Sequence, residues 1–123
     1  MPQRHRHIVA VVDDDPGVRD SLRFLLETAG HEVETYASAA GFLAGADPRR
    51  LSCLVLDQRM PKVAGLDLLV QLRGEGIATP TLLIASTVAP ALRQQAARLG
   101  VRCVLEKPLA HDDLLAQIDS VMA

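Results

Sequence analysis

Hydrophobic residues occur in two kinds of segment along this chain, short and nearly uninterrupted runs and longer stretches with helical spacing. Short runs without polar alternation are typical of strands that are buried on both faces of a sheet. Residues 31–36 alternate instead, which predicts a half-exposed edge strand. The other predicted strands are residues 8–12, 51–57, 81–85 and 101–105.

Helix signals fill the segments between these strands. Asp15 followed by Pro16 is a typical helix start, because aspartate caps the free amides of the first turn and proline fits the first helical position. Gly30 supplies a left-handed stop for this helix. Further helices are predicted after Ser38, from Gly65 to Gly74, from Pro90 to Gly100, and over a last stretch with the hydrophobic stripe Leu114, Leu115, Ile118, Val121 and Met122.

Strand and helix alternate five times, which predicts one α/β domain. Such alternation produces parallel strands joined by crossover helices that cover both faces of the sheet. The length of 123 residues suits a single domain. Residues 1–7 are polar and basic, so we expect a flexible tail there and a domain over residues 8–123, with no second domain.

Composition narrows the classes of function. Aromatic residues make up only 2% of the chain, which predicts an aliphatic core, and the formal net charge of −2 gives no basis for binding nucleic acid or membranes. No hydrophobic run approaches the roughly 20 residues of a membrane span, and we expect a cytoplasmic domain. Cys53 and Cys103 lie in hydrophobic runs, which predicts buried free thiols.

Three of the hydrophobic runs end in ionisable residues. Asp13 and Asp14 follow the first run, Asp57 ends the third, and Lys107 follows the last. The carboxyl ends of parallel strands lie at one edge of a sheet, where ligands bind in open α/β folds. Three carboxylates there repel one another, by roughly 3 kcal/mol for a pair about 5 Å apart at an effective dielectric constant near 20. A hard divalent cation such as Mg²⁺ relieves that repulsion.

The same residues suit phosphoryl chemistry. A carboxylate can act as a nucleophile toward phosphorus and form an aspartyl phosphate. A metal ion and Lys107 would neutralise charge on the transferred group. Each of these residues has a plain structural alternative, since strand-end aspartates cap helices and Lys-Pro is a common turn pair, so the prediction depends on their joint arrival at one edge.

From about Ile8 onward the chain resembles a response-regulator receiver domain of two-component signalling, most closely the FixJ-type group. The resemblance depends on Val-Asp-Asp-Asp at 12–15, Leu-Asp-Gln-Arg-Met-Pro at 56–61, Gly65, and Glu-Lys-Pro at 106–108. It implies a flavodoxin-like, doubly wound, five-stranded parallel sheet of order 2-1-3-4-5 with five helices. It also implies a signalling domain that catalyses only its own phosphoryl transfer and hydrolysis, and not an enzyme with a separate substrate.

The resemblance implies a role for each residue of the predicted site. Asp57 would accept the phosphoryl group from a phosphohistidine on a sensor histidine kinase. Asp13, Asp14 and Asp57, with the backbone carbonyl of Arg59, would hold Mg²⁺ or Mn²⁺. Lys107 would pair with Asp57 or its phosphate, and the Lys107–Pro108 bond resembles one that is cis in the family. The signal would pass to the face made by the fourth helix, fifth strand and fifth helix, which binds a partner or forms a homodimer.

Two positions depart from the family pattern. Ala85 stands where the family usually has the threonine or serine whose hydroxyl contacts the phosphate, and Val104 stands where it usually has phenylalanine or tyrosine. Because neighbouring strand residues point to opposite faces, Ser86 is expected to point away from the site. A one-residue shift would instead let Ser86 or Thr87 substitute.

Alternative functions remain open at this point. Ala85 and Val104 favour a receiver that acts as a protein-interaction scaffold with weak or no phosphorylation-dependent switching. A metal-dependent phosphohydrolase is disfavoured, since Arg59 occupies the position of its usual second aspartate. A dinucleotide-binding enzyme is disfavoured because no glycine-rich turn follows Val12. FixJ-type relatives usually carry a DNA-binding domain after the receiver, so DNA binding is expected only through such a domain.

Overall fold

The computed structural model describes residues 7–122, so most of the predicted N-terminal tail lies outside the described residues. Strands and helices alternate along the chain as the hydrophobic pattern predicts. The strands are β1 (Ile8–Val12), β2 (Glu32–Tyr36), β3 (Cys53–Asp57), β4 (Thr81–Ala85) and β5 (Cys103–Glu106). The helices are α1 (Pro16–Thr28), α2 (Ala39–Gly45), α3 (Gly65–Gly74), α4 (Pro90–Arg98) and α5 (His111–Met122), with one 3₁₀ turn, η1, at Pro48–Arg50.

The five strands form one parallel sheet in the order β2-β1-β3-β4-β5, which confirms the predicted fold class. In the register of neighbouring strands, Val12 lies opposite Leu56 and Ala85 lies opposite Glu106. This register brings the carboxyl ends of β1 and β3 to the same height at one edge. The chain order reverses beside β1, where it passes to β3, and that is where ligands bind in folds of this kind.

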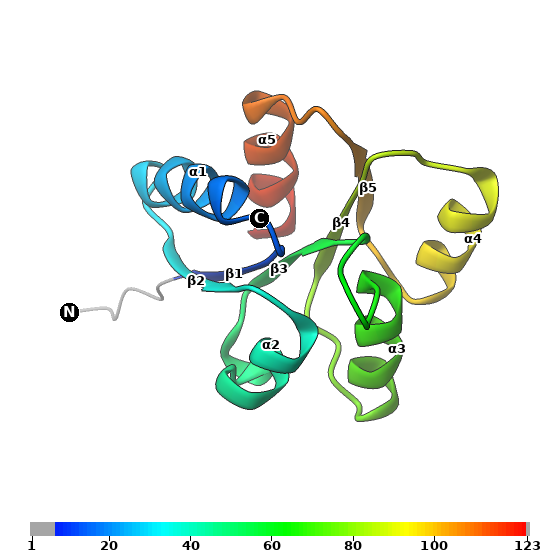
Figure 1. Ribbon diagram of the computed structural model, residues 1–123. Helices are drawn as coiled ribbons and strands as arrows, with labels where there is room; N and C mark the ends of the chain where they lie inside the picture. Colours follow the sequence, from blue (N-terminus) through cyan, green and yellow to red (C-terminus); the bar gives the residue numbers. More distant parts are fainter. Residues whose placement is uncertain (1–6, 123) are drawn as a thin grey trace.

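Helices cover both faces of the sheet (Figure 1). Leu22 and Leu26 of α1 and Leu114 and Ile118 of α5 are buried against one face. Hydrophobic residues of α2, α3 and α4, including Phe42 of α2, pack on the other. Most of these side chains are aliphatic, as the composition predicts. Among the described residues no helix is both long and apolar enough to cross a membrane.

Two predicted helix caps are present. The carboxylate of Asp15 accepts hydrogen bonds from the backbone amides of Gly17 and Val18, at 2.8 and 3.3 Å. The Ser38 hydroxyl accepts from the Gly41 amide at 3.0 Å. These side chains satisfy amides that have no partner within the helix, so each helix begins where the sequence predicts.

β5 differs from the sequence-based prediction. The predicted strand at residues 101–105 forms over Cys103–Glu106 and is only half-buried, whereas β1, β3 and β4 are buried throughout. β5 is an edge strand, paired with β4 alone. For the same reason the prediction of two buried thiols is correct for Cys53 and wrong for Cys103, which is half-buried.

Candidate phosphoacceptor site

Three aspartates meet at the carboxyl edge of the sheet. Asp13 and Asp14 follow β1, Asp57 ends β3, and each offers a carboxylate oxygen within 4.8 Å of the other two. We refer to Asp13, Asp14 and Asp57 as the acidic cluster. Asp13 and Asp57 are only 1% and 2% exposed, while Asp14 is exposed to solvent. Two of the three charges are therefore removed from water, which is costly unless a cation compensates them.

Backbone contacts fix the orientation of Asp13. One carboxylate oxygen, Oδ1, accepts a hydrogen bond from the Asp15 amide at 2.9 Å. Nη1 of Arg19, on α1, donates to the backbone carbonyl of Asp13 at 2.8 Å. Arg19 was not among the residues predicted from the sequence. Its position one turn into α1 is the only feature of the sequence that could have indicated this contact. The first helix therefore holds the turn that carries two members of the acidic cluster.

Among the described residues, Lys107 forms an ion pair with Asp57. Its Nζ lies 3.2 Å from Oδ1 of Asp57, and its side chain is 32% exposed. The Lys107 amide donates to the carbonyl of Ala85 at 2.8 Å, which extends the β4–β5 ladder to the site, and the Lys107–Pro108 bond is cis. The lysine side chain therefore reaches the acidic cluster from the edge strand across the end of β4, with part of its length in contact with water.

Burial dominates the electrostatics of the two buried carboxylates. Desolvation raises the pKa of Asp57, and the neighbouring Asp13 charge raises it further, while Lys107 lowers it. Desolvation also raises the pKa of Asp13, against lowering contributions from the Asp15 amide and Lys107. One ammonium group therefore does not compensate the desolvation and mutual repulsion of the cluster.

The donor set fits a hard divalent cation. Oδ2 of Asp13 and Oδ1 of Asp57 are buried without a hydrogen-bond donor among the described residues, although Lys107 contributes its ion pair to the latter. Buried polar atoms of this kind normally have partners. Carboxylate oxygens at one point, with an open side toward water, are ligands that suit Mg²⁺. The adjoining cavity of about 450 Å³ is also lined by Arg59.

The loop after β3 is tied closely to the phosphoacceptor candidate. A Cβ at Gly65 would lie 2.5 Å from the carbonyl oxygen of Asp57, so only glycine fits there. The Gly65 amide donates to the carbonyl of Gln58 at 3.0 Å, and the Gln58 side chain accepts from the Leu66 amide at 2.8 Å. This role of Gln58 was not predicted. The sequence did contain a sign of it, because Ala64 at the N-cap of α3 has no side-chain acceptor for the free amides of the first turn.

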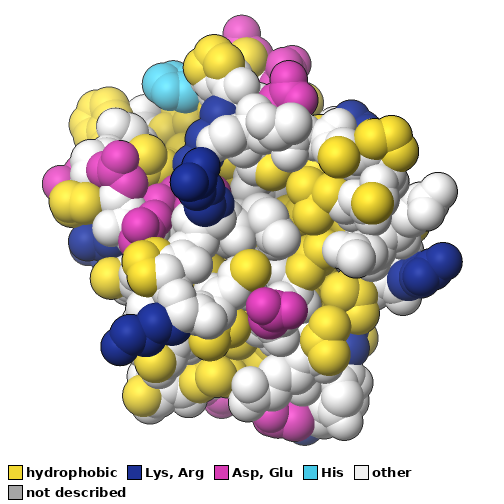
Figure 2. Space-filling view, turned by 45° about the vertical axis from the view of Figure 1, so that its right-hand side comes forward, with side chains coloured by type: hydrophobic (Ala, Val, Ile, Leu, Met, Phe, Trp, Pro, Cys, Tyr) yellow, Lys and Arg dark blue, Asp and Glu magenta, His cyan; other side chains and the backbone are white. Residues whose placement is uncertain are grey.

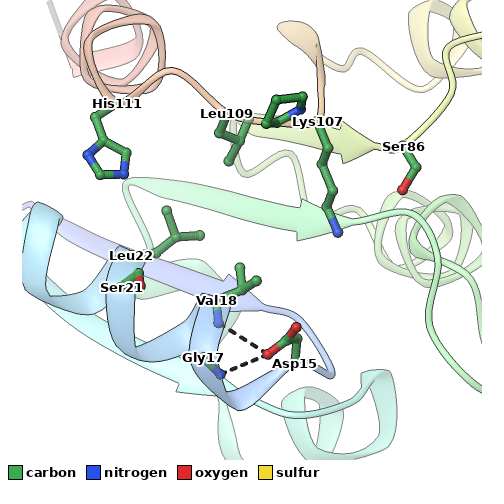
Figure 3. A pocket seen from close by; sticks show the side chains of 10 residues that line it. Asp15, Gly17, Val18, Ser21, Leu22, Ser86, Lys107, Leu109 and His111 are labelled. Atoms are coloured by element: carbon green, nitrogen blue, oxygen red, sulfur yellow. Dashed lines mark hydrogen bonds between the residues drawn. The ribbon is translucent and has the colours of Figure 1, made fainter.

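Ser86 lies differently from what strand alternation predicts. Ala85 is buried and lines a cavity of about 400 Å³ with Gln58 and Arg59 on the α3 side of the site. The expectation that Ser86 points away from the acidic cluster is wrong, because β4 ends at Ala85 and Ser86 lines the same cavity as Asp57. In Figure 3 the side chains of Ser86 and Lys107 extend in the same general direction from the ends of their strands.

Val104 is placed away from the acidic cluster. It is half-buried on β5 and packs against the core on the side of α2, α3 and α4. On this side a shallow cavity of about 300 Å³ lies between α3 and α4, lined in part by Val70, which is 55% exposed. Figure 2, in which the right-hand side of Figure 1 is turned forward, shows exposed hydrophobic side chains among polar ones on this surface. An aliphatic residue at 104 brings no hydroxyl or ring to this region.

A larger, mainly apolar cavity adjoins the acidic cluster on its other side. It measures about 720 Å³ and lies between α1 and the segment that leads from β5 to α5. Val18, Leu22 and Leu109 point into it, with His111 at the start of α5 (Figure 3). Asp15, Ser86 and Lys107 line both this cavity and the acidic one, so a helix or loop seated here would touch the phosphoacceptor candidate's neighbours.

Comparisons with known proteins agree with this geometry. A family model, the response regulator receiver domain, matches residues 9–119. The transcriptional regulatory protein FixJ of Azorhizobium caulinodans is 38% identical over 110 residues, which cover 89% of this chain and 52% of that protein. The regulator TdiR of Thauera aromatica is 36% identical over 115 residues, 94% of this chain and 51% of that protein. The chain thus spans about half the length of these curated relatives.

Solved structures give the same result. The chemotaxis protein CheY4 of Vibrio cholerae superposes with a TM-score of 0.87 at 29% identity and covers 94% of this chain and 98% of that one. The response regulator StyR has a TM-score of 0.87 at 38% identity, covering 94% of this chain and 58% of that one. The family match, the curated relatives and the order of the five strands lead to one conclusion: the chain belongs to the response regulator receiver domain family of two-component systems.

Proposed function

We propose that this receiver domain accepts a phosphoryl group on Asp57 from a phosphohistidine of a sensor histidine kinase. The observation that carries the proposal is a buried carboxylate beside a cation, with Lys107 Nζ 3.2 Å from Oδ1 of Asp57. In the transfer, a bond forms between a carboxylate oxygen and phosphorus while the phosphorus–nitrogen bond of the donor breaks. The bonding pair stays on the donor imidazole, which takes up a proton from water.

The chain's own groups prepare this step by position and charge. Asp57 is fixed at the end of β3, with Gly65 packed directly on its carbonyl. Lys107 neutralises part of the negative charge that gathers on the transferred group, a contribution that is strong where water is scarce. The acidic cavity is open to solvent, so a donor side chain can enter it. The attacking form is the carboxylate, which has no proton to lose and so needs no separate general base; burial, which raises the pKa of Asp57, disfavours this form, and Lys107 favours it.

Asp13, Asp14 and Asp57 would hold Mg²⁺ or Mn²⁺, with the backbone carbonyl of Arg59 as a further ligand. The fit is supported by the buried oxygens without donors on Asp13 and Asp57. Such an ion, when bound, stabilises the charge that develops on the transferred phosphoryl oxygens. The three neighbouring carboxylates favour a bound cation, because the cation lowers the repulsion among their negative charges.

We also propose how the domain passes the signal on. Phosphorylation adds about −1.5 to −2 charges, and this change would bias the face made by α4, β5 and α5, which would bind a partner or a second copy of the chain. Transcriptional regulation through DNA would require a further domain, of the kind implied by relatives about twice as long. The buried Ala85 and aliphatic Val104 favour a second candidate, a receiver that acts as an interaction scaffold with weak or no switching.

The phosphoacceptor proposal is tested by titrating the chain with beryllofluoride and Mg²⁺, a mimic of the aspartyl phosphate. NMR amide shifts and Tyr36 fluorescence are the readouts, because the Tyr36 carbonyl accepts from the Asp13 amide at 3.1 Å. We expect a saturable response that requires Mg²⁺ and is lost in Asp57→Asn. Asp67→Asn, an exposed aspartate on α3, is the matched control and should respond as the wild type does. A wild type without a saturable response would refute the proposal.

A further inference from the structure

The acidic cavity contains one hydroxyl side chain among its lining residues, and it is not at position 85. Ala85 has no hydroxyl and faces the neighbouring cavity on the α3 side. Ser86 lines the cavity that also holds Asp57 and Lys107, whereas Thr87 lines only the α3-side cavity. Of the two hydroxyls that follow β4, only that of Ser86 therefore adjoins the phosphoacceptor candidate.

The Ser86 hydroxyl is available for a ligand. Its side chain is exposed and has no hydrogen-bond partner among the described residues. Figure 3 shows Ser86 just beyond the end of β4, with its hydroxyl turned to the side on which the Lys107 ammonium lies. A phosphoryl group on Asp57 would place three acceptor oxygens at the carboxyl edge. The side chains with donor groups that line this cavity are those of Lys107, Ser86 and Arg59, and only Ser86 brings a hydroxyl.

Two contacts hold the loop of residues 86–89 in this position. The carbonyl of Ala85 accepts from the Lys107 amide at 2.8 Å, so the backbone before the loop is fixed to β5. The carboxylate of Glu106 accepts from the Val88 amide at 3.2 Å, which fixes the loop two residues later. Ser86 lies between these two attachments, and both attachments come from the residues next to or at Lys107.

We propose that the Ser86 hydroxyl donates the hydrogen bond to the phosphoryl oxygen on Asp57 that this chain cannot make from position 85, with Glu106 as the positioning residue. The inference rests on the proposed phosphorylation of Asp57 and assigns it a ligand. Such a bond would also change which residue the phosphoryl group draws toward the site. That residue would be an exposed one in the loop after β4, and not a buried side chain within β4.

The test compares the affinity of wild type and variants for beryllofluoride in saturating Mg²⁺. Ser86→Ala should weaken binding about tenfold to a hundredfold, the usual worth of a hydrogen bond to a charged group. Thr87→Ala is the matched control and should bind as the wild type does. Amide spectra without ligand verify that each variant is folded.

Glu106 is tested by a conservative pair. Glu106→Gln keeps an oxygen that can accept from the Val88 amide and should retain the affinity, whereas Glu106→Ala should lower it about two- to fivefold, as expected for a weak exposed hydrogen bond. If the wild type binds beryllofluoride and Ser86→Ala binds it with the same affinity, this inference is overturned while the proposed phosphorylation of Asp57 is not affected. A wild type that does not bind beryllofluoride would overturn both.

Discussion

The two halves of the sheet's carboxyl edge are built differently. At the ends of β1 and β3, every strand residue is buried, and Asp13 and Asp57 are held by short contacts from backbone amides, Arg19 and Lys107. At the ends of β4 and β5, the edge strand is half-buried and Ala85 is small. The loop that follows is attached to β5 by the hydrogen bond from the Lys107 amide to the Ala85 carbonyl and by an exposed one from the Val88 amide to Glu106. We call these halves the acidic half and the β5 half.

The difference separates two requirements of a phosphoryl-responsive domain. Accepting the group requires charges at fixed places, and the acidic half provides these through buried strands and tight turns. Responding to the group requires a side chain or loop that changes position when the charge arrives. In the β5 half, the available elements are an exposed loop and a half-buried edge strand, which cost less to move than packed core residues. If the halves are independent, a change in one should leave the properties of the other intact.

The largest expected effect follows from crowding the acidic half. In Gly65→Ala the new Cβ would lie 2.5 Å from the carbonyl oxygen of Asp57 and 3.0 Å from the Gln58 Cα, and neither backbone atom can yield cheaply. We expect the free energy of unfolding, measured by urea denaturation, to fall by about 2–3 kcal/mol. Gly74→Ala is the matched control, because nothing lies within 4 Å of the methyl group that alanine would add there and the helix gains about 0.5–1 kcal/mol. Equal effects of both changes would contradict the close approach.

The next effect tests the charge balance of the acidic half. Because the folded-state pKa of Asp13 is raised by burial, the folded chain binds that proton more tightly than the unfolded chain. This stabilising contribution is complete below the ordinary aspartate pKa and is lost as the pH rises through the folded-state pKa. Asp13→Asn should therefore be more stable than wild type near neutral pH without Mg²⁺, by about 1–2 kcal/mol for one buried charge.

Thermal unfolding in EDTA measures this effect, and the difference should shrink as the pH is lowered toward the acidic range. Asp14→Asn is the control, since Asp14 is exposed and its removal should change stability less. Saturating Mg²⁺ should reverse the order of wild type and Asp13→Asn, because only the wild type offers the full set of carboxylates. The same order with and without Mg²⁺ would contradict the proposed metal site.

A smaller effect tests the β5 half. Restoring a hydroxyl with Ala85→Thr and a ring with Val104→Tyr should create a coupling that the wild type lacks. In a double-mutant cycle on dimerisation with beryllofluoride and Mg²⁺, measured by sedimentation, we expect a coupling energy of about 0.5–1 kcal/mol. If the wild type already dimerises as strongly as the double variant, the scaffold interpretation fails. Ala91→Thr, exposed on α4, controls for the added hydroxyl.

The smallest expected effect is a difference in the rate of thiol alkylation between one cysteine of each half. Burial raises the pKa of the Cys53 thiol to about 12, and its side chain is 0% exposed on β3. Cys103 on β5 is half-buried. Iodoacetamide should modify Cys103 first and reach Cys53 only when the whole domain unfolds. Mass spectrometry of partly labelled protein measures the order, and equal rates would mean that the β3 side opens as readily as the edge.

Local patterns in the sequence predicted much of the fold and part of the site. The caps at Asp15 and Ser38 and the start of α3 at Gly65 were correct, because a cap or a helix start depends on neighbours within a few residues. The burial of β5 was wrong, since a hydrophobic run does not show whether its strand lies at the edge. Ser86 was placed on the wrong side because alternation applies only within a strand, and β4 ends one residue earlier.

The sequence by itself determined which residues carry charge at the ends of hydrophobic runs, and so which residues were candidates for the site. Only the tertiary structure decided that Asp13 is buried while Asp14 is exposed, and that Gln58 and Arg19 bind the backbone around them. The physical reason is range. Periodicity and capping are set by contacts within a turn or a strand, whereas burial and the meeting of β1, β3 and β5 ends depend on how crossover helices pack segments far apart in the chain.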